Sequence, residues 1–598
     1  MRPGQVIVLA TPVFFLLIAI EFAVARRRAA KNRGAGGMPA YGMADAINSI
    51  GLGMLSQVAS VFTKLLSIGI YGAVFGAVAL LPDTDFWTRW YGWLLALVFY
   101  DFCYYWLHRM GHRCAVLWAA HVVHHQSQHY NLSTALRQTS SGALLGWIFY
   151  LPMAVAGVPP LVFGVVALVD LLYQFWVHTE QIGRLGWFDR WFCAPSNHRV
   201  HHAVNDAYLD RNYGGILLVW DRLFGSYREE DEACVYGTRS PLQSWDPLWA
   251  NAEVYWSLAR DSWHARRWSD KLRVWLKPPG WRPADVAARF PKPAFDIGRV
   301  RRFDPAVDAG LRAFALLQFV ALLAGAIAFL WRSDLLPAAQ ALVWFAALTT
   351  GLWSLGQALQ GRLALLELLL IDAATLATAS AALGLQSLHL VFKPLAMLLA
   401  IAWVLRRSGP ERRLPATLLL LAALLGSLAG DVLLMLAPRF FVPGLAAFLC
   451  AHLAYTARFS LGVGLLPRRG PLAATLAIGA AMYLLLWLGG LPVALRLPVG
   501  LYVIVIACMA AQALGRAALL GTPAARAAAA GACLFMLSDA LLAANRFVAP
   551  LPLAPLWVLA SYYAAQILIV RNLLAGAPGE RAAAALAAPC PETAAKPG

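Results

Sequence analysis

The stretch VIVLATPVFFLLIAIEFAVARRR (residues 6–28) is an apolar run that ends in three arginines. A cleaved signal peptide carries its positive charge before a shorter apolar core, so this order predicts a retained membrane-spanning helix. Cytoplasmic loops of membrane proteins are enriched in lysine and arginine. We therefore expect Arg26, Arg27 and Arg28 to lie on the cytoplasmic side of a membrane, which we take to be a bacterial inner membrane.

The composition extends this prediction to the whole chain. Of the 598 residues, 60% are hydrophobic and only 13% are charged, whereas a soluble domain carries about 25% charged residues. Apolar runs near the roughly 20 residues of a membrane span recur, which predicts an all-α, polytopic helical membrane protein. The net charge of +18 comes from arginines at the ends of these runs and in one polar block. No RNA- or DNA-binding signature accompanies them, so we exclude nucleic acid as a partner.

The order of apolar and polar segments predicts four parts. Residues 1–305 form a first membrane domain, in which a polar block at about 178–305 is a cytoplasmic helical cap. Residues 306–384 add further spans to that module, residues 385–575 form a second multi-span helical bundle, and residues 576–598 are a disordered tail. Within the first part, the run at 49–81 is too long for one straight span, and the run at 141–177 is split by GVPP.

Histidines gather in three clusters, HRMGH (108–112), HVVHH (121–125) and HRVHH (198–202). Their spacings place imidazoles on one face of a helix. A tetrahedral zinc site takes four ligands, so eight histidines indicate two metal ions, and imidazole suits iron, zinc, copper and nickel alike. The predicted ligands are His108, His112, His121, His124, His125, His198, His201 and His202.

Another interpretation is that these histidines are solvent-exposed residues at helix ends. One such cluster would fit that interpretation, but three clusters near the ends of apolar runs favour a dinuclear site. His178, in QFWVHTE, stands alone and is predicted as a ninth ligand, whereas His129 and His264 are left out. Two ferrous ions at a membrane surface can activate dioxygen against an unactivated C–H bond, which indicates a lipid oxygenase or desaturase.

The residues around the clusters carry a resemblance. DFCYYWLHRMGH (101–112), HYNLSTALRQ (129–138), LLYQFWVHTE (171–180) and the segment from PSNHRVHH (195–202) to FGSY resemble the membrane fatty acid hydroxylase and sterol desaturase superfamily. Within it they are most similar to the alkylglycerol monooxygenases, and the likeness extends to about residue 380. At Asn197 the chain departs from the histidine expected in animal relatives.

This resemblance implies an enzyme that hydroxylates the ether-bearing carbon of an alkylglycerol, with release of a fatty aldehyde. It implies two iron ions, dioxygen as co-substrate and tetrahydrobiopterin, with an electron donor or a pterin-recycling reductase as partner. Glu180 and Asp221 are candidates for orienting ligand imidazoles. Their alternative role is that of helix-end charges paired with nearby arginines.

The second half has few polar residues inside its apolar runs. Lys393, Asp431, His452 and Asp539 are the ionisable ones that we take as catalytic candidates, because a charge near the bilayer centre costs about 2.5–3.5 kcal/mol on insertion scales. A carboxylic acid in an apolar site can protonate the carbon of a vinyl ether, and a second carboxylate can stabilise the resulting cation. The alternative is that buried Asp–Lys or Asp–His pairs hold the bundle together.

FKPLAML (392–398), GDVLLML (430–436), FLCAHLAYT (448–456) and LFMLSDALL (534–542) resemble the lysoplasmalogenase family of membrane hydrolases over about 385–575. The resemblance implies cleavage of the vinyl ether of lysoplasmalogens. The positions that match its motifs are Lys393, Asp431, His452, Tyr455, Ser538 and Asp539.

Both resemblances concern ether-linked glycerolipids, so the sequence predicts a bifunctional ether-lipid-degrading enzyme of the lipid bilayer. One alternative is a sterol or fatty-acyl hydroxylase or desaturase with a non-catalytic second half. A more remote one is a metal transporter or sensor, which predicts membrane spans lined with histidine.

Overall fold

The computed structural model describes residues 3–31, 40–82, 84–436 and 438–574. Within these ranges the protein is helical, and the only strand-like pairings are two isolated bridges, Phe192 with Leu217 and Ala203 with Tyr236. The all-α prediction is confirmed. The tail predicted at 576–598 lies outside the described residues.

Eleven helices in the described ranges are long and apolar enough to cross a membrane, so the protein is a multi-pass membrane protein. Backbone groups that face lipid have no water to bond with, and a helix satisfies them internally. The eleven are α1 (Pro3–Lys31), α2 (Met43–Val78), α17 (Ala309–Arg332), α18 (Ala338–Leu359), α19 (Leu365–Ala382), α20 (Gln386–Ser408), α21 (Pro415–Leu436), α23 (Arg469–Leu488), α24 (Val493–Leu520), α25 (Pro523–Phe547) and α26 (Ala554–Leu573).

The chain divides into two compact units. The first takes residues 1–336 and 352–362, and the second takes residues 337–351 and 363–598, so that α18 contributes to both. In the first unit, α17 packs on α1 and α2. Two further apolar helices, α4 (Trp90–Arg113) and α10 (Pro160–Trp176), pack on each other and carry functional side chains.

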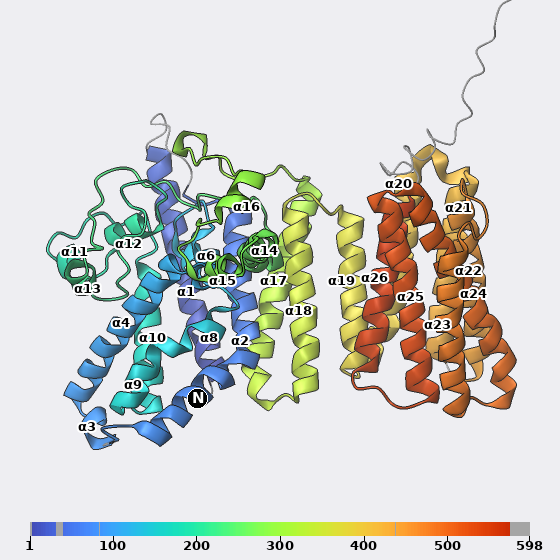
Figure 1. Ribbon diagram of the computed structural model, residues 1–598, viewed down its shortest axis with the longest axis horizontal. Helices are drawn as coiled ribbons and strands as arrows, with labels where there is room; N and C mark the ends of the chain where they lie inside the picture. The colour runs from blue at the N-terminus through green and yellow to red at the C-terminus, as the bar shows by residue number, and fades with distance from the viewer. Residues whose placement is uncertain (1–2, 32–39, 83, 437, 575–598) are drawn as a thin grey trace, which may run out of the picture. The chain divides into compact units, whose positions relative to one another are not determined.

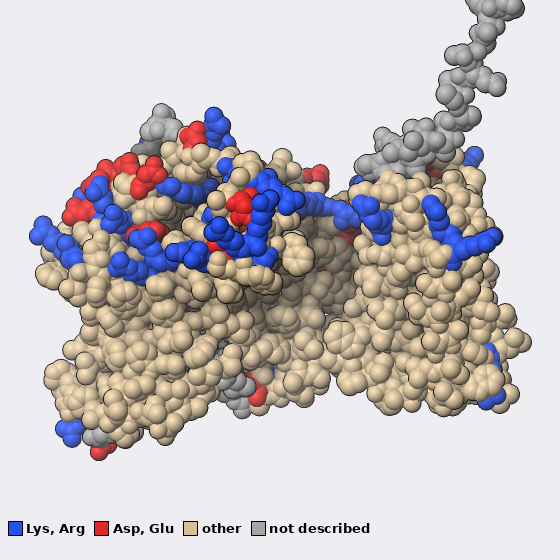
Figure 2. Space-filling model, viewed as in Figure 1, with Lys and Arg blue, Asp and Glu red and all other residues tan. Residues whose placement is uncertain are grey.

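Short helices and loops form a polar cap at one end of the first unit (Figure 1). Figure 2 shows charged side chains gathered over this end, whereas the surface over α4, α9 and α10 has few of them. The short helices of this unit are α3 (Thr84–Thr88), α5 (Ala115–Ala119), α6 (Val122–His125), α7 (Leu132–Ala135), α8 (Gly142–Leu145), α9 (Leu151–Ala156), α11 (Phe188–Trp191), α12 (Pro195–His202), α13 (Val219–Leu223), α14 (Pro247–His264), α15 (Trp268–Leu276) and α16 (Ala284–Arg289).

The two unusual apolar runs of the first unit fold differently from each other. The run at 49–81 lies mostly in one continuous helix, α2, of which residues 43–63 are apolar enough for a span. The run at 141–177 breaks at Gly157, whose φ of +99° favours glycine, and a Cβ there would lie 2.2 Å from the carbonyl oxygen of Leu81. Gly157 therefore turns the chain from α9 into α10.

The second unit is a bundle in which consecutive helices pair, α19 with α20, α21 with α22 (Phe441–Ser460), α23 with α24 and α25 with α26. Small residues let these helices approach closely, as is typical of membrane bundles. A Cβ on Gly430 of α21 would lie 2.5 Å from the ring of Phe448 on α22. This packing brings the polar residues of separate helices within reach of one another.

Candidate metal centre and a second buried site

The third histidine cluster forms a short buried helix, α12, that starts at Pro195. A proline is well placed in the first turn because its missing N–H would have no helical partner there. The side chain of Asn197 accepts a hydrogen bond from the backbone N–H of Ala194 at 3.1 Å and so caps this helix. Asn197 stands where we expect a histidine in animal relatives, and here its side chain stabilises the N-terminus of α12.

The nine predicted ligands meet in two groups, and each group draws on more than one cluster. Within a group, one ligand atom from each residue lies within 4.8 Å of all the others. His178 belongs with the third cluster in space, although it stands alone in the sequence. The first group is His108, His112, His121, His125 and His201, and the second is His124, His178, His198 and His202.

Backbone carbonyls fix the tautomers of two histidines in the second group. Nδ1 of His124 lies 3.0 Å from the carbonyl oxygen of Arg137, and Nδ1 of His178 lies 2.8 Å from that of Gln174. A carbonyl only accepts, so both Nδ1 atoms carry protons. Burial lowers the pKa of His124 to about 4 and the pKa of His178 well below its ordinary value, so both rings are neutral at pH 7.

The two Nε2 atoms of this pair are therefore bare lone pairs, yet they lie only 3.1 Å apart. No proton is available to bridge them, and a cation between them removes the repulsion. Two imidazole nitrogens that bind one ion at about 2.1 Å lie roughly 3.0 to 3.4 Å apart. The Nε2 atoms of His198 and His178 are also 3.1 Å apart, and those of His202 and His198 are 3.2 Å apart. These residues fit a metal ion.

The first group likewise combines Nδ1 atoms bonded to backbone carbonyls with unpartnered Nε2 atoms. Nδ1 of His108 lies 2.8 Å from the carbonyl oxygen of Tyr213, and Nδ1 of His201 lies 2.9 Å from that of Arg211. The buried Nε2 atoms of His108, His112 and His201 have no hydrogen-bond partner among the described residues. Burial lowers the pKa of His201 well below its ordinary value, which keeps the lone pair free for a ligand role.

Asp221 acts on the first group through the backbone. Its buried carboxylate accepts from the N–H groups of Tyr213 and Gly214, at 2.8 and 2.7 Å, and from the hydroxyl of Ser226 at 2.7 Å. It thereby holds the loop whose Tyr213 carbonyl orients His108. Glu180 is exposed, and the hydrogen bonds of the described residues do not join it to any of the nine histidines.

Arg137 is a positioning residue that the sequence analysis did not single out. Its side chain is 1% exposed and donates to the carbonyl of Val123 at 2.7 Å and to Asn48 at 2.9 Å. Its own carbonyl orients His124. Burial lowers the pKa of this guanidinium to about 10, so it remains charged at pH 7.

Two cavities in the first unit reach the histidines. A cavity of 160 Å³ lies among apolar residues of α1, α2, α10 and α17 and ends at His124 and His178. A second cavity, of 250 Å³, is lined by His108, His121 and His124 and by the polar residues Asp170 and Gln174. A lipid with an apolar tail and a polar head would find a matching surface for each part.

The ionisable candidates of the second unit form two separate clusters. In one, the ammonium of Lys393 lies 3.3 Å from Asp431, which accepts a hydrogen bond from the Tyr562 hydroxyl at 2.6 Å. In the other, the hydroxyl of Tyr502 lies 2.8 Å from Nε2 of His452 and 2.5 Å from Asp539.

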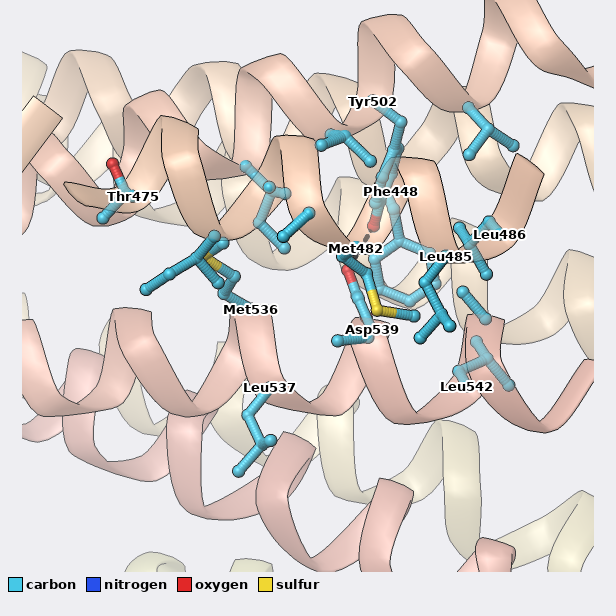
Figure 3. A pocket seen from close by; sticks show the side chains of 18 of the residues that line it. Phe448, Thr475, Met482, Leu485, Leu486, Tyr502, Met536, Leu537, Asp539 and Leu542 are labelled. Carbon is cyan, nitrogen blue, oxygen red and sulfur yellow. Dashed lines mark hydrogen bonds between the residues drawn. The ribbon is translucent and has the colours of Figure 1, made fainter. Parts of the chain in front are cut away.

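The second cluster opens to a cavity of 590 Å³, which Tyr502 and Asp539 line together with mostly apolar side chains such as Phe448 and Met482. Figure 3 shows the Tyr502 and Asp539 side chains pointing toward each other among these residues. Of the four catalytic candidates, only Asp539 lines this cavity. Two motif residues serve the packing of α26 instead: Tyr455 donates to Gln566 and Ser538 donates to the carbonyl of Val558.

The tyrosines Tyr502 and Tyr562 were missed in the sequence because they stand inside apolar runs without a charge of their own. A hydroxyl buried in a membrane helix is nevertheless a signal, because it needs a partner.

Comparison with known proteins assigns a family to each part of the chain. Residues 93–226 match the fatty acid hydroxylase family and residues 388–573 match the YhhN family. The chain is 36% identical to human alkylglycerol monooxygenase over 318 residues, which cover 53% of this chain and 69% of that protein. It is 36% identical to the human lysoplasmalogenase TMEM86B over 181 residues, which cover 30% of this chain and 72% of that protein.

A bacterial protein, the ornithine lipid hydroxylase OlsE of Rhizobium tropici, is 31% identical over 147 residues, which cover 24% of this chain and 44% of that protein. No solved structure matches the chain.

The two histidine groups predict two bound transition-metal ions per chain. We expect His201→Ala and His198→Ala each to reduce the metal content by about one ion, because each removes a ligand from a different group. Elemental analysis of the purified full chain measures this. His264→Ala, outside both groups, is the control and should keep both ions; equal loss in that variant would contradict the assignment.

The role of Asp221 predicts a loss of metal affinity without a loss of a ligand. In Asp221→Asn, an amide group would face backbone N–H donors, so the Tyr213 loop should loosen and metal affinity should fall about tenfold or more. Competition with a chelator measures the affinity. Asp231→Asn, at an exposed carboxylate paired with arginines, is the matched control. A folded Asp221→Asn protein with unchanged affinity would refute this role.

Proposed function

Because the chain belongs to the fatty acid hydroxylase family, as an alkylglycerol monooxygenase-like member, and carries a YhhN family domain at residues 388–573, we propose that it is a bifunctional enzyme that degrades ether-linked glycerolipids. The first unit cleaves alkyl ethers by oxidation, and the second hydrolyses vinyl ethers. The observation that carries the first activity is the pair of buried histidine groups, members of which line two cavities.

The alkyl-ether reaction inserts one oxygen atom into the C–H bond beside the ether oxygen. Dioxygen supplies that atom, and two electrons and two protons reduce the other atom to water. The resulting hemiacetal collapses to a fatty aldehyde and glycerol. Two bound iron ions would supply the activation of dioxygen. Tetrahydrobiopterin, or a reductase that delivers electrons, is the proposed electron donor.

The residues of the chain contribute binding and water exclusion. The nine histidines would hold the ions. The carbonyls of Tyr213, Arg137 and Gln174 hold the rings of His108, His124 and His178, respectively, in the ligand tautomer. The apolar cavity beside His124 and His178 takes the alkyl chain, which keeps water from the reacting carbon.

We propose that the cap and the histidines face the cytoplasm. The arginines at the C-terminal end of α1 support this placement, because the guanidinium of Arg28 donates to the carbonyl of Gln181 in the cap at 2.7 Å. The basic end of a span is typical of the cytoplasmic side. The bacterial inner membrane stays a prediction, since the relatives include animal proteins as well as a bacterial one.

The alternatives predict other features. A metal transporter needs ligands along its spans, whereas the two histidine groups lie at the ends of α4 and α10 and in the cap. A sterol or fatty-acyl hydroxylase with an inactive second unit would leave the Asp539 cluster without a role.

For the second unit, the placement of Asp539 at the large cavity supports vinyl-ether hydrolysis. A proton can pass along the hydrogen bonds from His452 through Tyr502 to Asp539. Protonated Asp539 then gives its proton to the vinyl carbon. Water adds to the oxocarbenium ion and returns a proton to the Asp539 carboxylate, and the neutral hemiacetal releases aldehyde and the glycerol-bearing alcohol. Asp431 pairs with Lys393 and is not among the described residues that line this cavity, so it is a second carboxylate whose contribution the assay below separates.

A paired assay tests both activities on membranes that contain the full chain. Labelled alkylglycerol and labelled lysoplasmalogen should each yield fatty aldehyde. We expect His201→Ala to abolish only alkyl-ether cleavage, and Asp539→Asn to lower only vinyl-ether hydrolysis, by about 10² to 10⁴-fold, because general acid catalysis contributes that much.

Each variant serves as the folding control for the other unit. Asp431→Asn is measured alongside. Selective loss of vinyl-ether hydrolysis in this variant would identify Asp431 as a second catalytic carboxylate, and full activity would show that Asp431 has a structural role. The absence of aldehyde from both substrates with the unaltered protein would overturn the proposed function.

A further inference from the structure

The helices α14 and α15 of the first unit turn an apolar stripe outward. On α14 three tryptophans recur every seven residues, and on α15 a tryptophan and two leucines recur every four, so each set lies on one side of its helix. The stripe consists of the exposed residues Trp249, Trp256, Trp263, Trp268, Leu272 and Leu276. Trp263 and Trp268 are 80% and 81% exposed. An apolar stripe normally faces the core, and a large exposed one marks a surface that something else covers.

The two helices form a hairpin, the α14–α15 hairpin, that lies where apolar helices of the first unit end. At its start, Gln357 in the last turn of α18 donates to Asp246, the residue before α14, at 2.6 Å. At its end, the backbone N–H of Ala115, just past the C-terminus of α4, donates to the carbonyl of Lys277, the residue after α15, at 3.0 Å. The end of a membrane-spanning helix marks the border of the hydrocarbon core. These contacts place the hairpin along that border, at the level of the lipid head groups.

The outer surface of the hairpin is basic. Its exposed ionisable residues are Arg260, Arg266, Arg267, Arg273 and Lys277. Its three acidic residues are not exposed, and two of them, Asp261 and Asp270, pair with arginines. In Figure 2, lysine and arginine side chains form a band between the charged end of the first unit and the surface with few charges. A basic surface at this level attracts anionic phospholipid head groups.

We propose that the α14–α15 hairpin is a lipid-binding element that lies in the membrane interface on the cap side. Its apolar stripe inserts among the upper parts of the acyl chains, and the arginines beside the stripe bind the phosphates of anionic phospholipids. Tryptophan is enriched at this depth of a membrane because its ring is apolar and its N–H is polar. Helices with tryptophan and leucine on one face and arginine and lysine on another bind membranes in this way. This binding does not depend on either proposed ether-cleaving activity.

The position of the stripe favours lipid over a partner protein. The spans of the chain themselves bring a bilayer to this level, because the hairpin touches the ends of apolar helices. A second copy of the chain or a water-soluble protein would have to displace the head groups from the same place. The tryptophans are also interleaved with cations along both helices, which matches the layered chemistry of a membrane surface.

The hairpin also touches the segments that carry the histidines. The side-chain amide of Gln126, next to His125, donates to the carbonyl of Ala250 in α14 at 3.1 Å. Ala115, which bonds to the end of the hairpin, is the first residue of α5, between the first two histidine clusters. A hairpin held in the head-group layer therefore fixes the depth of the histidine groups relative to the lipid leaflet.

Photo-labelling of the full chain in nanodiscs tests the contact. The probes are phosphatidylcholine and phosphatidylglycerol with a diazirine in the upper part of one acyl chain, each in nanodiscs of unlabelled phosphatidylcholine. Mass spectrometry of peptic peptides should find label within residues 249–276 from both probes. The phosphatidylglycerol probe should give about tenfold more of it, because each exposed cation adds attraction for an anionic lipid.

Label on α17, which carries exposed apolar residues such as Leu317 and Val320, shows that the probe reaches the folded protein. An unlabelled hairpin together with a labelled α17 would overturn the proposal.

The double variant Arg266→Gln, Arg267→Gln separates the charge from the apolar contact. It should lower the ratio of phosphatidylglycerol label to phosphatidylcholine label on the hairpin about fivefold, while the phosphatidylcholine label persists. The matched control is Arg184→Gln with Arg228→Gln, which removes two exposed arginines elsewhere in the cap and should keep the ratio. An unchanged ratio in the first variant, or cross-links from the hairpin to a second copy of the chain in place of lipid, would overturn the proposal.

Discussion

The candidate metal centre depends on hydrogen bonds from imidazole Nδ1–H groups to backbone carbonyls. His108, His124, His178 and His201 each donate to a carbonyl at 2.8 to 3.0 Å. Each bond fixes a ring in one orientation and one tautomer, so that Nε2 faces the centre as a lone pair. In water these rings would rotate and share the proton between both nitrogens. The fold removes that freedom before any ion arrives.

The segments that carry these carbonyls are in turn held by buried ionisable side chains. Asp221 fixes the loop of Tyr213, and Arg137 ties its own segment to α2 through Asn48. Both are buried charges, which cost free energy unless they are paired or hydrogen-bonded. Asp221 accepts mainly from backbone N–H groups. Arg137 donates to the carbonyl of Val123 and otherwise to side chains of neighbouring segments, so both residues tie the segments that orient the imidazoles to their surroundings.

The sequence predicts the helices and the ligand set because both follow local rules. Hydropathy marks the spans, and the spacing in HRMGH and HRVHH brings imidazoles to one face of a helix. The partition of the ligands is different, since His201 joins His108 whereas its neighbour His202 joins His124. That division depends on how α4, α6 and α12 cross in space, which no local pattern contains. Tyr502 was overlooked for a related reason: it is a single polar residue in an apolar run, and its role follows only from the cavity beside it.

The chemistry of the two ether types explains why one chain would contain two unlike sites. A vinyl ether has a π bond that accepts a proton, and the ether oxygen stabilises the cation, so a buried carboxylic acid such as Asp539 is sufficient. A saturated alkyl ether has no such bond, and a protein acid is too weak to cleave it, so its carbon must first be oxidised. That step requires an oxidant stronger than any side chain, and hence metal ligands. Both routes pass through a hemiacetal and end in an aldehyde. In the proposed function, the nine histidines and the Asp539 cluster would thus be two solutions to one problem, the cleavage of an ether link, and the two substrates differ by a single degree of unsaturation.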